Sequence, residues 1–175
     1  MDSASLQTLG AHLQQLRLAR GISLSQLAAD AGIAKSNLSR IEQGKSNPTI
    51  DTMWRLALQL QVPFGNLVAP INSAVGDDDV YVRLIDQGNQ QPRVDAYWMY
   101  CAAHILHQSQ PHSAGTRETI NMISGQLVVL VAGQSYSLSS GDSFTFDASQ
   151  SHAYRTGEQP AACLLSVIYD GEAQL

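Results

Sequence analysis

SLSQLAADAGIAKSNLSRIEQG, residues 23–44 of this 175-residue chain, predicts two short helices joined by a tight turn. Ser23 is the expected N-cap of the first helix, because its hydroxyl can accept a hydrogen bond from a first-turn amide. Gln26 follows three residues later, where its side chain can reach back to the Ser23 amide and complete a capping box. Gly32 and Gly44 stand where a left-handed residue can end each helix, so a compact helical pair is expected.

The second helix of the pair, expected over residues 34–43, has an apolar face and a polar face. Ala34, Leu38 and Ile41 recur at helical spacing and are expected to face inward. The polar face is cationic and bears amide and hydroxyl groups, which suit phosphates and base edges in a DNA major groove. The pair therefore fits a helix-turn-helix motif, although an ordinary helical hairpin with a solvated face has the same local pattern. The outward residues are Lys35, Ser36, Asn37, Ser39 and Arg40.

The flanks of the pair favour the helix-turn-helix alternative, because they extend it into a long ordered set of motifs. Five segments together resemble the phage-repressor-type (XRE) DNA-binding domain. They are LG at 9–10, RG at 20–21, SLSQLA at 23–28, GIAKSNLSRIEQG at 32–44 and NPTIDTMWRLA at 47–57. The resemblance covers about residues 6–69. It implies a five-helix bundle that binds an operator in double-stranded DNA.

The resemblance also implies which side chains meet the DNA. Leu24 departs from the pattern, because many members carry a Gln at this position that contacts the DNA backbone. Backbone anchoring is therefore expected from other groups near phosphates, namely Ser23, Gln26, Ser39 and Lys45. Lys35, Ser36, Asn37 and Arg40 are expected near bases.

Three further helices and a boundary complete the first half. Apolar residues spaced three and four apart predict a first helix over 4–20. Thr49 can cap a fourth helix, and Pro63 suits the start of a fifth helix at 64–68. Residues 70–79, within APINSAVGDDD, are rich in turn-forming and charged residues and predict a solvated linker.

Composition limits the class of protein. Apolar residues make up 44% of the chain and charged residues 14%, which is enough for a packed core. No apolar run approaches the roughly 18–20 residues that span a membrane, and no secretory signal is evident, so a cytoplasmic protein is expected. Residues 1–70 carry a net charge of +2 and residues 71–175 a net charge of −7, which fits a nucleic-acid module joined to a different module. Cys101 and Cys163 lack metal-site spacing and are expected to be buried free thiols.

After residue 80 the pattern changes to short alternating segments with Gly-containing turns. This pattern predicts an all-β sandwich or barrel. The fold class is thus expected to be α + β in two domains, with a five-helix bundle at 1–69 and an antiparallel β-barrel at 80–175. The expected strands are 80–86, 95–108, 117–124, 126–132, 135–138, 143–147, 152–156 and 162–169.

Two histidines and a glutamate in this half resemble the motifs of the cupin barrel, a jelly-roll-like fold. His112, Glu118 and Gly125 match the first cupin motif in spacing, and Gly141 and His152 match the second. The resemblance covers about residues 95–170. Metal-binding cupins usually offer three histidines and one glutamate.

This chain departs from the cupin pattern, which leaves two alternatives for the site. Ala114 stands in place of a usual histidine. Two imidazoles and one carboxylate, from His112, Glu118 and His152, remain a workable set for a divalent ion, zinc first, with an open position. Alternatively, a metal-free pocket binds a small polar effector through His112, Arg117, Glu118 and His152, with Tyr154 as a candidate aromatic wall.

The two resemblances together imply a transcriptional regulator with an N-terminal DNA-binding domain and a C-terminal cupin sensor. Regulators with this layout resemble members tied to amino-acid and sulfur metabolism. A homodimer is expected, because half-sites about one helical turn (~34 Å) apart require two copies. Catalysis is not expected, since no nucleophile–base pair follows from the spacing. The alternatives are a metal-dependent cupin enzyme, an isomerase or dioxygenase, fused to the DNA-binding domain, and a DNA binder with an inert barrel.

Overall fold

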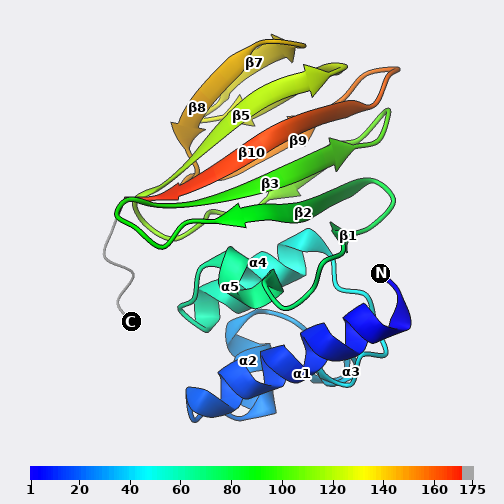
Figure 1. The fold of residues 1–175 in the computed structure, drawn as a ribbon, viewed down its shortest axis with the longest axis vertical. Helices are drawn as coiled ribbons and strands as arrows, with labels where there is room; N and C mark the ends of the chain where they lie inside the picture. The colour runs from blue at the N-terminus through cyan, green and yellow to red at the C-terminus, as the bar shows by residue number, and fades with distance from the viewer. Residues whose placement is uncertain (171–175) are drawn as a thin grey trace. The chain divides into compact units, whose positions relative to one another are not determined.

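The computed structural model describes residues 1–170, and residues 171–175 of the expected second domain lie outside the described part (Figure 1). The chain divides into two compact units with a boundary between Asp77 and Asp78. Of the described residues, we call Met1–Asp77 the helical unit and residues 78–170 the strand unit. Within residues 1–170, no helix is long and apolar enough to span a membrane.

The helical unit contains the five helices that the sequence predicts. Asp2, Ser23 and Thr49 each accept a hydrogen bond from a first-turn amide, at 2.8, 3.1 and 3.2 Å, and so fix three helix starts. The predicted capping box is wrong in its second half, because the Gln26 side chain donates to Asp30 at 2.7 Å instead of turning back. The helices are α1 (Ser3–Ala19), α2 (Leu24–Asp30), α3 (Lys35–Glu42), α4 (Ile50–Gln59) and α5 (Phe64–Val68).

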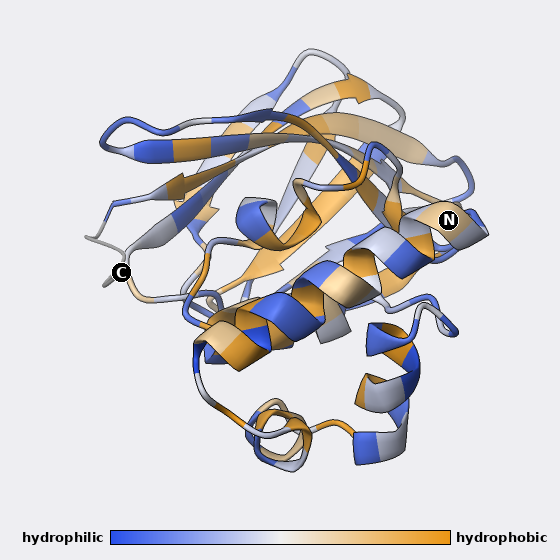
Figure 2. Ribbon diagram, turned by 60° about the horizontal axis from the view of Figure 1, so that its bottom comes forward, coloured by the Kyte–Doolittle hydropathy of each residue, from blue (hydrophilic) through white to orange (hydrophobic). Residues whose placement is uncertain are grey.

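The core of the helical unit is built from the apolar stripes of its helices. Orange and blue alternate along the long helix α1 in Figure 2, as expected for a helix that is buried on one side only. Leu13, Leu27 and Leu38, from α1, α2 and α3, are fully buried. Their burial packs the predicted helical pair against the first helix and leaves the polar face of α3 exposed.

Gly10 marks the closest approach of α1 to α3. A Cβ atom at this position would lie 2.4 Å from the Ile41 carbonyl oxygen and 2.7 Å from that of Glu42. We therefore expect Gly10→Ala to destabilise the helical unit by about 1–3 kcal/mol, measured by urea unfolding. A Gly-to-Ala change in an uncrowded helix has the opposite sign and stabilises by roughly 1 kcal/mol, so a more stable variant would contradict this packing.

The stretch expected to be a solvated linker is only partly exposed. The run Asp77–Asp79 is exposed, but Ile71 and Val75 are buried. Val75 and Gly76 form the short strand β1 (Val75–Gly76), and the Asn47 side-chain amide donates to the Gly76 carbonyl at 2.8 Å. Isolated apolar residues such as Ile71 and Val75 give no periodic pattern, so the sequence did not predict that this stretch is partly buried and contains a short strand.

The strand unit consists of two antiparallel sheets. The larger has the order β2-β3-β10-β5-β8 and the smaller β4-β9-β6-β7. The structure confirms the predicted β-rich antiparallel architecture. It does not confirm the predicted barrel, because the two sheets are not closed into one. The strands are β2 (Val80–Gln87), β3 (Arg93–Cys101), β4 (Leu106–Ser109), β5 (Thr116–Ser124), β6 (Gln126–Val131), β7 (Gln134–Ser139), β8 (Ser143–Asp147), β9 (His152–Arg155) and β10 (Ala161–Tyr169).

One predicted strand, 95–108, is wrong because the chain breaks within it. β3 ends at Cys101 and pairs with β10, whereas β4 begins at Leu106 and pairs with β9 in the other sheet. Between them His104 adopts a left-handed conformation with φ of +60°. No Gly or Pro marks this turn, so its sequence gave no breaker signal.

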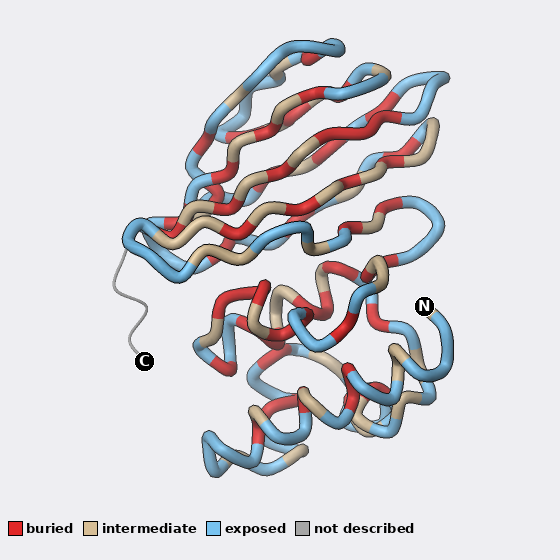
Figure 3. Tube along the Cα trace, in the orientation of Figure 1, coloured by how far each residue is buried: buried red, intermediate tan, exposed pale blue. Residues whose placement is uncertain are grey.

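Buried residues alternate with intermediate ones along the central strands β3 and β10, as the red and tan segments of Figure 3 show. Tyr97, Met99 and Cys101 of β3 are buried, as are Cys163 and Val167 of β10. The two cysteines are free and buried, as predicted. Burial raises the pKa of the Cys101 thiol to about 12, which makes it an inert core group rather than a nucleophile.

Candidate functional site

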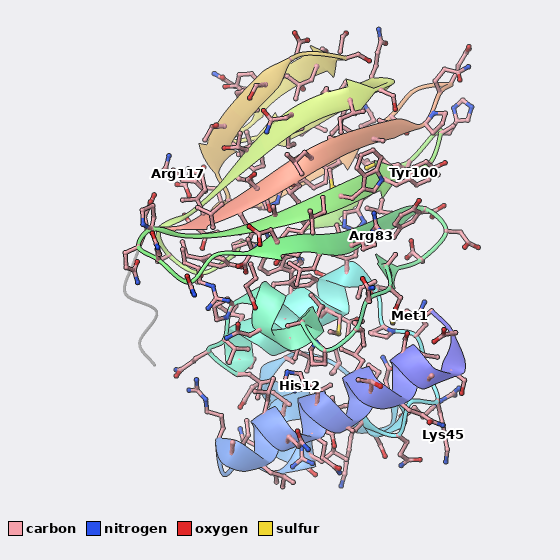
Figure 4. The ribbon with its side chains drawn as sticks, viewed as in Figure 1. Met1, His12, Lys45, Arg83, Tyr100 and Arg117 are labelled. Carbon is pink, nitrogen blue, oxygen red and sulfur yellow. The ribbon has the colours of Figure 1, made fainter. Side chains whose placement is uncertain are left out.

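The polar face of α3 lies exposed on the helical unit. Lys35, Ser36, Asn37 and Arg40 are exposed, and Ser39 is half-buried. The Lys45 amide donates to the Arg40 carbonyl at 2.8 Å, so Lys45 lies directly after the end of α3. Figure 4 labels Lys45. Exposed cationic and amide groups along one helix face can meet both phosphates and base edges.

A buried ion pair that the sequence did not single out holds α3 in place. The Arg17 guanidinium on α1 donates to both carboxylate oxygens of Glu42 on α3, at 2.7 and 2.9 Å, and to the Ile22 carbonyl at 3.0 Å. This bidentate contact fixes the orientation of α3 against α1. A signal existed, because Arg17 follows Leu13 by four residues and so continues the apolar stripe of α1.

A second clamp fixes the turn between α2 and α3. Arg55 on α4 donates to the carbonyls of Ala31 and Gly32, at 3.2 and 3.1 Å, and pairs with Asp51 at 2.9 Å. These carbonyls end α2 and have no partner within that helix. Arg55 therefore joins α4 to the turn that sets the direction of α3.

The strand unit brings together the three residues that the sequence selected for a metal. His112 follows β4, Glu118 lies on β5, and His152 begins β9. His112 Nε2 lies 2.7 Å from Glu118 Oε1, and His152 Nε2 lies 3.8 Å from Glu118 Oε2. All three side chains are at most 2% exposed, so this His–Glu–His cluster is a buried polar site between residues of both sheets.

Hydrogen bonds set the protonation of the cluster. The Gln150 carbonyl can only accept, so His152 Nδ1, 2.9 Å away, carries the proton and Nε2 offers a lone pair toward Glu118. Burial lowers the pKa of His152, which keeps the imidazole neutral. Burial acts to raise the pKa of Glu118, but the hydrogen bond from His112 and the proximity of both imidazoles lower it below its ordinary value. The cluster is therefore an anionic carboxylate between two imidazoles.

Tyr154 joins the cluster, whereas Arg117 does not. The Tyr154 hydroxyl donates to Glu118 Oε2, and burial together with the Glu118 charge raises the pKa of Tyr154 well above its ordinary value. Arg117 was expected to face the same pocket, which is wrong. It precedes Glu118 on β5 and so points to the opposite face, where its side chain is 47% exposed and pairs with Asp170 (Figure 4).

The donor set of the cluster fits a divalent metal. One ligand atom from each of the three residues lies within 4.8 Å of the others. His152 Nε2 is buried and makes no hydrogen bond within the described residues, which is the state of an imidazole ready to coordinate. The Gln150 carbonyl supplies the outer contact that usually orients such a ligand. Two nitrogens and one carboxylate suit zinc and leave an open position.

A shallow depression of about 300 Å³ lies at the end of the smaller sheet where His152 begins β9. Gln134 and Ser135, which open β7, line it together with Ser151 and His152. Sequence reasoning missed these residues because Gln and Ser in a turn region carry no distinctive spacing. The depression has a mixed polar and apolar lining and lies next to the backbone that carries one cluster imidazole.

Comparisons with known proteins agree with both halves of the structure. A helix-turn-helix family model matches residues 13–67, and a cupin domain model matches residues 104–168. The HTH-type transcriptional regulator SutR of Escherichia coli is 34% identical over 167 residues, covering 92% of this chain and 94% of that protein. The HTH-type transcriptional regulator SinR of Bacillus subtilis is 39% identical over 61 residues, covering 34% of this chain and 55% of its own length.

A solved structure extends the likeness to the whole fold. The crystal structure of an HTH_3 family transcriptional regulator from Vibrio cholerae has a TM-score of 0.84 and 26% identity, covering 97% of this chain and 99% of that one. The class is therefore a DNA-binding helix-turn-helix domain followed by a cupin domain. The chain belongs to the family of XRE-type HTH transcriptional regulators that carry a cupin domain. Its relatives named above are regulators, which favours a regulator over a cupin enzyme.

Proposed function

We propose that this chain is a transcriptional regulator whose helical unit reads an operator and whose strand unit binds a small polar effector. The observation that carries the proposal is the exposed cationic face of α3, held by the buried pair of Arg17 and Glu42. The proposed domains are residues 1–69 for DNA and 80–175 for the effector, with 70–79 between them. The enclosed β-barrel typical of cupins is part of this proposal for the second domain.

The proposed DNA contacts fall into two groups. Residues near bases would specify sequence, and residues near phosphates would anchor the domain without reading sequence. All of them are exposed apart from half-buried Ser39. The base group is Lys35, Ser36, Asn37 and Arg40, and the phosphate group is Ser23, Gln26, Ser39 and Lys45.

Binding as a homodimer belongs to the proposal for two reasons. The helical unit carries only a small positive charge, so one copy would gain little from phosphate contacts alone. Two linked copies raise the effective concentration of the second binding event. A two-fold dimer would read half-sites about one helical turn (~34 Å) apart.

The effector site is proposed at the His–Glu–His cluster with Tyr154. His112, Glu118 and His152 would hold a divalent metal, zinc first, and a bound metal supplies a Lewis-acidic position for an oxygen, nitrogen or sulfur of the effector. Glu118 offers the negative charge, and Tyr154 and Gln150 orient Glu118 and His152 through their hydrogen bonds. The buried His152 Nε2, which makes no hydrogen bond within the described residues, lies 3.8 Å from Glu118 Oε2, and this arrangement supports a bound cation.

Arg40→Ala tests the base contacts. We expect the variant to lose about 1–3 kcal/mol of binding to a duplex selected from a random pool and to lose sequence preference. The measurement is the Kd for selected and random duplexes at one fixed salt concentration. Arg83→Ala, which removes an exposed charge from β2, is the matched control and should leave both values unchanged. Equal loss on both duplexes would make Arg40 a phosphate contact, and no loss on either would contradict the proposed surface.

A further inference from the structure

The larger sheet of the strand unit has an inner and an outer face. Asp95, Val167 and Glu118 lie opposite one another on β3, β10 and β5 and form one row, which is a line of directly opposed residues across the strands. Glu118 contacts Tyr154 of β9, so this row belongs to the inner face that meets the smaller sheet. The residues between such rows point to the outer face. Residues 78–170 form no third layer of helix or sheet, so nothing in the strand unit covers the outer face.

The outer face is apolar along its two central strands, β3 and β10. An antiparallel sheet with one face toward water usually carries polar residues on that face. None of the outward residues of β3 and β10 is charged, and Tyr100 stacks on Tyr81 of β2 with ring centroids 5.0 Å apart. Figure 4 labels Tyr100 on this face. The outward residues are Val94, Ala96, Trp98 and Tyr100 of β3 and Ala162, Leu164, Ser166 and Ile168 of β10.

The strand β2, beside β3, adds two opposite charges to the outer face. Arg83 lies opposite Trp98, and Asp86 lies opposite Ala96, because the register shifts between Leu84 and Asp86. Arg83 and Asp86 therefore belong to neighbouring outward rows, which we call the Arg83 row and the Asp86 row. Both side chains are exposed, and neither forms an ion pair within residues 1–170.

The sizes of the apolar residues differ between the two rows in the same way on both central strands. The Arg83 row continues with the large residues Trp98 and Leu164. The Asp86 row continues with the small residues Ala96 and Ser166. One row thus has a cation and bulky side chains, and the next has an anion and small ones.

The two flanking rows have the same relation to each other. Tyr100 and Ala162 form the row beyond the Arg83 row, and Val94 and Ile168 form the row beyond the Asp86 row. A large residue in one flanking row corresponds to a smaller one on the same strand in the other. The outer face is therefore complementary to itself when the order of its rows is reversed.

We propose that the outer face of the larger sheet binds the same face of a second copy of the chain. The two-fold axis lies between the Arg83 row and the Asp86 row and runs across the strands. It places Arg83 over Asp86 of the partner subunit and Trp98 over Ala96 of the partner subunit. Each contact occurs twice, as a two-fold interface requires. This inference rests on the homodimer of the proposed function and names its surface.

The charges select this axis over the other one that can bring two such faces together. An axis along the strands would place Arg83 over Ser143 of the partner subunit, which is uncharged. The face is also large enough for a second copy. Strands about 30 Å long and five strands about 24 Å across give on the order of 700 Å², near the roughly 800 Å² per partner of a standard interface.

The test is sedimentation velocity of the full chain over a series of protein concentrations. Arg83→Asp and Asp86→Arg each reverse one exposed charge, so neither disturbs a packed group. Arg155→Asp makes the same reversal on β9 of the smaller sheet and is the matched control. Two further samples are the double variant Arg83→Asp/Asp86→Arg and an equimolar mixture of the two single variants. In both samples, opposite charges meet again across the axis.

We expect wild type and Arg155→Asp to form equally stable dimers. Each single variant at the axis puts like charges opposite each other at two places, and its dimer dissociation constant should rise about tenfold or more. The double variant and the mixture should recover the wild-type association. A monomeric wild type, single variants that dimerise as wild type does, or a mixture no tighter than either single variant would each overturn the inference.

Truncation of Arg83 differs from its reversal. Removing one partner of an exposed ion pair has little effect on affinity, because water solvates the charge that is left. Arg83→Ala therefore remains a neutral control for DNA binding.

Binding to a selected duplex is measured in parallel, because the surface and the proposed function can fail separately. Dimers that persist in the charge-reversed variants, with specific DNA binding intact, refute this surface but not the regulator. A wild type that dimerises as described but binds no selected duplex refutes the proposed function and leaves the surface in place.

Discussion

Glu42→Ala is expected to lower the free energy of unfolding of the helical unit by about 3–5 kcal/mol. The Glu42 carboxylate accepts two hydrogen bonds from Arg17, and the two side chains are only 4% and 8% exposed. Removing the carboxylate leaves the guanidinium buried with only the Ile22 carbonyl as partner. The cost is therefore dominated by an uncompensated charge rather than by the lost contact.

Urea unfolding of the full chain, followed by circular dichroism at 222 nm, measures this change. The signal reports on the helical unit because all helices within residues 1–170 belong to it. Asp51→Ala is the matched control, since its pair with Arg55 is 26% and 31% exposed and should contribute about 1 kcal/mol or less. The double variant Arg17→Met/Glu42→Leu removes both charges and should recover most of the loss. A Glu42→Ala effect no larger than that of Asp51→Ala would show that the pair does not hold α3.

The same pair links stability to DNA recognition. The N-cap position of α3 is Ala34, which makes no side-chain cap hydrogen bond, so the orientation of α3 depends on tertiary contacts more than on its own cap. Arg17 holds its last residue, Glu42, and Arg55 holds the carbonyls of the turn before it. In this chain, Arg17 and Arg55 thus fix α3 and the turn before it through contacts within the helical unit.

The helical unit could be predicted closely from sequence because its signals are local. Ser23 and Thr49 cap helices, and apolar residues at spacings of three and four define each buried face. The roles of Gly10 and Arg17 are not local, because they depend on how α1 packs against α3. The close approach at Gly10 has no local signature and was not predicted. The buried pair was not predicted either, although Arg17 continues the apolar stripe of α1.

In the strand unit the sequence identified the cluster but not all of its neighbours. His112, Glu118 and His152 were found because motif spacing survives the long separations between strands. Arg117 was wrongly predicted to face the same pocket as Glu118. Successive residues of a strand point to opposite faces, so the sequence already indicated that Arg117 and Glu118 do not share one. Asp95 was overlooked because it is two strands from Glu118 in the sheet, and only the register β3-β10-β5 reveals that they share a row.

Glu118→Gln is expected to weaken zinc binding to the full chain roughly 100-fold or more. The substitution keeps the size of the side chain but removes the negative charge and replaces one of the two acceptor oxygens by an NH2 donor. In the wild type, the proton of His112 Nε2 lies between that imidazole and the carboxylate at 2.7 Å. A divalent ion held here would lie between the imidazole and the carboxylate, so its affinity depends on the charge of Glu118.

Competition with a chromophoric zinc chelator, after removal of metal by dialysis, measures the affinity. Glu158→Gln is the matched control, because it makes the same substitution at an exposed position after β9 and should bind zinc as wild type does. Equal zinc affinity in the two variants would place the ion elsewhere in the chain. Absence of zinc binding by wild type would instead favour the metal-free pocket, in which Glu118 is held by His112 and Tyr154 alone. Zinc binding that is lost in Glu118→Gln indicates a carboxylate that coordinates the metal. No zinc binding by wild type indicates a carboxylate that orders a polar pocket.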